Sequence, residues 1–100
     1  MQLVPALMCS TPISNNGVIT ATWSYIHTGG LPLTDVSVFY TFLEGGRDSD
    51  PTKVPVSGVD VTSVMVPNLV AGFEYTLTVT ASNSNGSSSV QCGPVFHEVG

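Results

Sequence analysis

The chain has 100 residues, enough for one domain with one hydrophobic core and too few for a second domain. Hydrophobic residues make up 42% of it and charged residues 9%, which argues against a disordered chain. The net charge is −5 with only two basic residues, so we expect no nucleic-acid partner and no direct membrane contact.

The first segment, residues 3–9, is apolar and is expected to form a strand. The stretch from Met1 to Cys9 lacks the basic start and the long apolar region of a signal peptide, so we expect the natural chain to extend upstream. No run in the chain approaches the roughly 20 apolar residues of a membrane-spanning helix.

Three strands are predicted from a period-two alternation along the chain, with many β-branched and aromatic side chains. They cover residues 17–25, 33–43 and 74–82. Their inward faces supply the expected core, to which the family resemblance described below adds Leu69. The core residues are Trp23, Val36, Val38, Tyr40, Leu69, Tyr75, Leu77 and Val79.

Further strands are expected at residues 52–56, 59–66 and 88–97. Gly, Pro, Asn and Asp clusters separate the predicted strands, as at Asn15-Asn16-Gly17. Seven short strands with this spacing, and no stretch of helical period, predict an all-β sandwich. We expect residues 1–100 to form it as a single domain.

With these strands placed, the chain resembles a fibronectin type III domain. Trp23 stands where that family has its core tryptophan, and Leu69 to Tyr75 is similar to the family's leucine, proline-glycine and glutamate-tyrosine corner. Ala71 departs from this pattern, since proline is usual there, and most members lack cysteines. The resemblance implies a seven-stranded immunoglobulin-like β-sandwich of fibronectin type III topology. It also implies that the Tyr75 hydroxyl bonds the preceding loop.

The two cysteines, Cys9 and Cys92, are too few for a zinc site and have no finger-like spacing to a histidine. The residues alone leave either one disulfide or two free thiols. In the family's topology the first and last strands run along neighbouring edges of the two sheets. The resemblance therefore implies a disulfide between Cys9 and Cys92, and hence an oxidising, extracellular location.

No catalytic, cofactor or metal site is predicted. His27 and His97 lack a partner motif for acid–base work. Asp48, Asp50 and Asp60 lack the spacing of a calcium loop. We expect no enzyme activity and no small-molecule substrate.

Three surface features are candidates for modification or recognition. Asn85 begins an Asn-Gly-Ser glycosylation sequon at a predicted hairpin tip. Phe39 and Leu43 alternate away from the core and are candidates for a protein-binding patch, although scattered surface hydrophobicity is the alternative. The other candidate surface is the loop end of the sandwich, formed by residues 26–32, 57–58 and 83–87.

The resemblance implies a non-catalytic extracellular module of a cell-surface receptor, adhesion or matrix protein. Such a module spaces neighbouring domains of its chain and binds a protein partner. The alternatives are an accessory or linker module of a secreted microbial carbohydrate-active enzyme and an intracellular elastic scaffold repeat. An intact disulfide and an occupied sequon favour the first and exclude the last.

Overall fold

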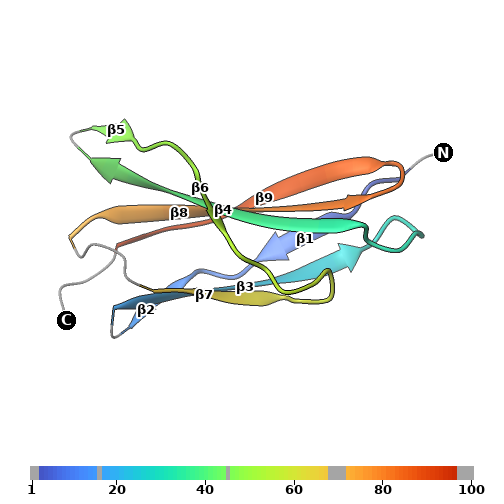
Figure 1. Cartoon of the computed structure of the whole chain (residues 1–100), viewed down its shortest axis with the longest axis horizontal. Helices are drawn as coiled ribbons and strands as arrows, with labels where there is room; N and C mark the ends of the chain where they lie inside the picture. Colours follow the sequence, from blue (N-terminus) through green and yellow to red (C-terminus); the bar gives the residue numbers. More distant parts are fainter. Residues whose placement is uncertain (1–2, 16, 45, 68–71, 97–100) are drawn as a thin grey trace.

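A computed structural model (Figure 1) describes residues 3–15, 17–44, 46–67 and 72–96. In these residues the regular structure is entirely β, arranged as two antiparallel sheets. No described segment forms a helix that is long and apolar enough to cross a membrane.

The first sheet is built around β3 (Val18–His27). Strands β1 (Ala6–Cys9) and β2 (Ile13–Asn15) pair with successive parts of β3, and β7 (Ser63–Val66) pairs with it as well. Both β2 and β7 pair with the same stretch of β3, so they lie on opposite edges of it. Pro12 falls between β1 and β2, where a residue without a backbone N–H interrupts the pairing.

The second sheet has β4 (Asp35–Glu44) and β8 (Glu74–Asn83) at its centre. Strand β9 (Gly86–Phe96) pairs with the free edge of β8. Strands β5 (Arg47–Asp48) and β6 (Thr52–Val54) pair in turn with the other edge of β4. The sheet therefore has β9 along one edge and the short β5 and β6 along the other.

The hydrophobic core lies between the two sheets, because the alternation of each long strand directs one face inward. Strand β8 shows this most regularly, with every second residue buried from Tyr75 to Asn83. Trp23 is 2% exposed, and its indole N–H donates to the Tyr25 hydroxyl at 3.4 Å. The expected core residues Trp23, Val36, Val38, Tyr75, Leu77 and Val79 are buried, Tyr40 is half-buried against the core, and Leu69 lies outside the described residues.

The strands differ from the expected set at several places. The expected strand over residues 59–66 is shortened to β7, and the expected first strand to β1. Strands β2 and β5 were not expected. Each has at most three residues and pairs with an adjacent long strand, β2 with β3 and β5 with β4.

The predicted disulfide is present and joins the two sheets. It connects Cys9 of β1 to Cys92 of β9, with the Cα atoms 5.5 Å apart. The Cys92 side chain is buried and that of Cys9 is half-buried. One side of the molecule is thus closed by a covalent bond between β1 and β9, whereas β6 and β7 border the other side (Figure 1).

Candidate protein-binding face

The outer face of the five-stranded sheet carries the apolar pair predicted from the sequence. Phe39 and Leu43 both lie on β4, four residues apart, and Thr41 lies between them on the same face. Phe39 pairs with Thr78 on β8 and with Lys53 on β6, so its ring lies near the middle of the sheet rather than at an edge.

Phe39 lines a shallow hollow of about 290 Å³ on this face, together with Thr41, Pro51 and Thr78. The Phe39 side chain is half-buried, so part of its ring remains accessible to a partner. The lining combines one aromatic ring with a proline and two hydroxyls and carries no charge. A partner surface with an apolar side chain surrounded by neutral hydrogen-bonding groups would match this lining.

Leu43 lies on the same face but does not line the hollow. It is 42% exposed and pairs with Glu74 at the end of β8. The structure therefore places the two predicted patch residues on one face without bringing them into one pocket. Ser37, Thr76, Thr80, Ser89 and Gln91 occupy neutral outward positions of the paired strands, whereas Lys53 lies opposite Phe39 and Glu74 opposite Leu43.

The loop end is organised around a buried asparagine that the sequence did not single out. The Asn83 side chain is 5% exposed. Its Nδ2 donates to the carbonyl oxygens of Leu3 and Thr28, at 3.1 and 2.9 Å, and its Oδ1 accepts the backbone N–H of Asn85 at 2.8 Å. One side chain thus holds together the N-terminal segment, the β3–β4 connection and the β8–β9 turn, which lie at one end of the molecule (Figure 1).

The sequon asparagine belongs to the same cluster. Asn85 is half-buried, and its Nδ2 donates to the carbonyl oxygen of Leu3 at 2.9 Å. The amide nitrogen that would carry a glycan therefore faces the N-terminal segment in this structure. Ser88 of β9 also donates its hydroxyl to the carbonyl oxygen of Pro5, so both the β8–β9 turn and β9 contact that segment. Glycosylation at Asn85 remains a prediction.

The histidines and carboxylates do not gather into a site in the described part of the chain. His27 is exposed, and its Nδ1 accepts the backbone N–H of Gly29 at 3.1 Å. His97 and the side chain of Asp48 lie outside the described residues. No three described His, Cys, Asp or Glu side chains come close enough together to hold a metal ion.

Neither the family models nor the curated proteins compared with this chain give a match. Function is therefore inferred from the disulfide, the outer face of the five-stranded sheet and the loop end.

Proposed function

We propose that this chain is a non-catalytic extracellular module of a cell-surface receptor, adhesion or matrix protein. It spaces neighbouring domains and binds a protein partner. The observation that carries this proposal is the disulfide between Cys9 and Cys92. Structural disulfides form and persist in oxidising compartments and are rare in the cytosol, so the bond supports an extracellular location.

The order of the strands supports a fibronectin type III topology. When β1 and β2 are taken as one interrupted strand and β5 as an extension of the β4 hairpin, seven strands remain. The first, second and fifth of these form one sheet, and the third, fourth, sixth and seventh form the other. Sandwiches of this kind are common in extracellular modules.

The position of the two ends supports the spacer role. Leu3 accepts hydrogen bonds from Asn83 and Asn85 at the loop end, whereas Phe96 pairs with Glu74 at the opposite end of the sheet. The molecule is elongated, with principal extents of 46 × 25 × 19 Å. A chain that enters at one end and leaves at the other can be joined to similar modules in a row.

Secretion and thiol content test the location. We expect the chain, fused to a secretion signal and expressed in eukaryotic cells, to accumulate in the medium as a monomer without reactive thiols. Its intact mass should be about 2 Da below that of the reduced chain, because two hydrogens are lost when the disulfide bond forms. Retention in the cell, or secreted protein with two titratable thiols, would contradict the proposal.

The protein-binding role is tested at the outer face. We expect fluorescent tetramers of the chain to bind to adherent cells or to the matrix that they deposit. Phe39→Asp should abolish this binding, since a carboxylate would replace the aromatic ring that lines the hollow. Ser24→Asp is the matched control, because Ser24 is an exposed residue of the other sheet. Equal binding by both variants would remove the outer face from the proposal.

A further inference from the structure

The four most exposed large hydrophobic side chains in the described part of the chain lie on the outer face of the four-stranded sheet. They are Met65, Ile13, Ile26 and Met8, with exposed fractions of 67, 65, 64 and 59%. Single hydrophobic residues scattered over a surface are normal, but a group of them on one face indicates an interaction site. This outer surface of β1, β2, β3 and β7 is called the apolar face below.

The pairing of the strands brings these side chains to a common face. Strand β3 buries every second residue from Ile19 to Trp23, so the residues that alternate with them point outward. Cross-strand partners share a face. Met8 of β1 is paired with the outward Ser24. The outward Thr20 has Ile13 of β2 on one side and Met65 of β7 on the other.

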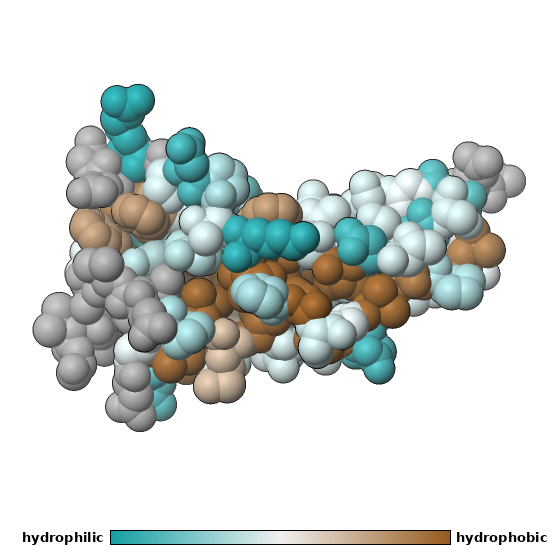
Figure 2. All heavy atoms as spheres, viewed as in Figure 1, coloured by the Kyte–Doolittle hydropathy of each residue, from teal (hydrophilic) through white to brown (hydrophobic). Residues whose placement is uncertain are grey.

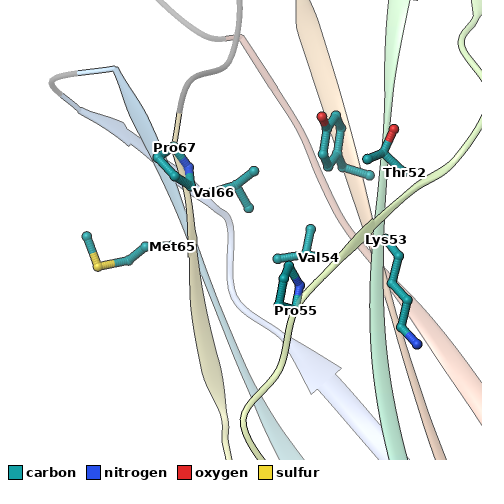
Figure 3. Close-up of a pocket in the computed structure, with 8 residues that line it drawn as sticks. Thr52, Lys53, Val54, Pro55, Met65, Val66 and Pro67 are labelled. Atoms are coloured by element: carbon teal, nitrogen blue, oxygen red, sulfur yellow. The ribbon is translucent and has the colours of Figure 1, made fainter.

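Met65 lies at the β7 margin of the apolar face. Figure 3 shows its side chain directed away from that of Val66, which points toward Val54. Val54 and Val66 line a groove of about 410 Å³ between β6 and β7, on the open side of the sandwich. Figure 2 shows a band of hydrophobic surface along this open side. The apolar surface therefore continues around the margin of the sheet.

The strands of the apolar face contain no charged residue. Neither Asp, Glu, Lys nor Arg occurs in β1, β2, β3 or β7. The described carboxylates belong to the five-stranded sheet and its loops, as at Asp35 and Glu74, except for Asp60 in the crossover before β7. A chain with a net charge of −5 thus has one sheet whose strands are free of charge.

This distribution of charge favours a second copy of the chain as the occupant of the apolar face. A neutral face offers no charge by which an unlike partner could be selected. In a twofold contact both partners use the same surface, so an excess of one charge on that surface would meet itself. The apolar face avoids this repulsion, whereas an acidic surface would not.

The net charge of each copy does not oppose such a contact. When two sandwiches pack through their four-stranded sheets, their five-stranded sheets are separated by three sheet spacings, about 30 Å. The Debye length at physiological ionic strength is about 8 Å. Repulsion between the carboxylates of the two five-stranded sheets is therefore largely screened.

The size of the apolar face indicates how strong the contact is. Strand β3 has ten residues and the sheet is three strands wide, so the face measures roughly 33 by 14 Å. Two such faces in contact would bury on the order of 1,000 Å² in total, at the lower end for specific interfaces. The chain should therefore be monomeric in dilute solution and associate where copies are concentrated, as on a cell surface or in a matrix.

We propose that the apolar face is a self-association surface, through which two copies of the chain pack face to face about a twofold axis. Met8, Ile13 and Met65 of each copy are covered by the other copy. The contact leaves the Phe39 hollow on the opposite sheet free for a different partner. The inference thus goes beyond the proposed function and does not depend on it.

The test compares two variants that add the same charge to different sheets. Sedimentation equilibrium of the intact disulfide-bonded chain, from about 10 μM to about 1 mM, should show a reversible monomer–dimer equilibrium. Ser24→Asp places a carboxylate within the apolar face and should weaken dimerisation at least about tenfold. Ser89→Asp is the matched control, because Ser89 is an exposed serine of the five-stranded sheet, and it should dimerise as the unaltered chain does.

A second variant and a mapping experiment complete the test. Met65→Thr removes apolar surface without adding charge and should weaken dimerisation at least about threefold. As the concentration of the unaltered chain is raised, side-chain methyl chemical shifts should change most at Met8, Ile13 and Met65. This measurement decides the matter even if Ser24→Asp fails to fold.

Several outcomes would overturn the inference. They are the absence of self-association up to about 1 mM, equal dimerisation of Ser24→Asp and Ser89→Asp, and concentration-dependent shifts centred on the Phe39 hollow or the loop end. Binding of the apolar face to neutral lipid vesicles or to an unlike protein, without self-association, would assign it to that partner instead.

The two proposals fail separately. Phe39→Asp should lose binding to cells and still dimerise, whereas Ser24→Asp should lose dimerisation and still bind to cells. Loss of dimerisation in Phe39→Asp would overturn the assignment of the contact to the apolar face.

Discussion

At the scale of single residues, Gly29, next to the Asn83 cluster, is tightly constrained. A Cβ atom at Gly29 would lie 2.6 Å from Nδ2 of Asn83 and 2.7 Å from the carbonyl oxygen of Leu3, closer than such atoms approach. Its φ of +82° is also unfavourable for other residues. Gly30 has nearly the same φ, +80°, but a Cβ atom there would meet nothing within 4 Å.

This contrast gives a matched pair of variants. We expect Gly30→Ala to cost about 1 kcal/mol, the cost of a left-handed residue that is not glycine. Gly29→Ala should cost about 2–4 kcal/mol, because it also displaces the buried amide of Asn83 from its partners. Denaturant unfolding measures the difference, and hydrogen exchange should show faster opening of β1 in Gly29→Ala only. Equal destabilisation by the two variants would show that the Asn83 cluster does not hold the N-terminal segment.

Trp23 allows a second prediction at this scale. Trp23→Ala should destabilise the domain by about 3–5 kcal/mol, because it removes the largest buried side chain and leaves a cavity between the sheets. The midpoint of denaturant unfolding measures this loss. An unchanged midpoint would mean that Trp23 does not pack in the core.

At the scale of strands, alternation predicted the long elements well and the short ones poorly. β3, β4 and β8 each have enough residues for a period of two to be recognised, and their ends fall within two residues of the predicted limits. β2 and β5 have three and two residues, too few for any period. They exist because a neighbouring long strand offers hydrogen-bond partners, and sequence-local patterns contain no such information.

The candidate sites also divide into one that a local sequence pattern predicts and two that it does not. The outward position of Phe39 follows from the alternation of β4, and its face was predicted. The Asn83 cluster and the apolar face were not, because each depends on segments that are distant in the sequence. Asn83 contacts Leu3, 80 residues away, and the apolar face exists because β2 and β7 bring Ile13 and Met65 to opposite sides of Thr20. No local pattern marks either contact.

Two neighbouring residues of β8 test the register directly. Val79 is fully buried and Thr78 faces the outer hollow. We expect Val79→Thr to lower the free energy of unfolding by about 1–3 kcal/mol, because the threonine hydroxyl would be buried in the apolar core without a hydrogen-bond partner. Thr78→Val should change stability by no more than about 0.5 kcal/mol, as for ordinary surface substitutions. Thermal or denaturant unfolding of both variants checks this, and the reverse order of effects would require the two faces of β8 to be exchanged.

At the scale of the whole molecule, the disulfide closes a loop with a sequence separation of 83 residues. The chain-entropy model assigns such a loop about 4–5 kcal/mol of stabilisation, through restriction of the unfolded chain. We therefore expect the double variant Cys9→Ala, Cys92→Ala to unfold at clearly lower denaturant concentration than the oxidised chain. The reduced unaltered chain is the matched control and should unfold close to the double variant. Oxidised and reduced chains with the same midpoint would contradict this contribution.

The same bond determines how the molecule responds to mechanical load. A tensile force applied through the two ends passes from β1 to β9 across the bond between Cys9 and Cys92 and bypasses the strands between them. Without the bond, unfolding would release those 83 residues, roughly 270–300 Å of extended chain. With it, that length stays locked within the ring, and only the residues outside the two cysteines can lengthen. A row of such modules would behave as a tether of nearly fixed contour length, and it would become extensible only where a reductant opened the ring.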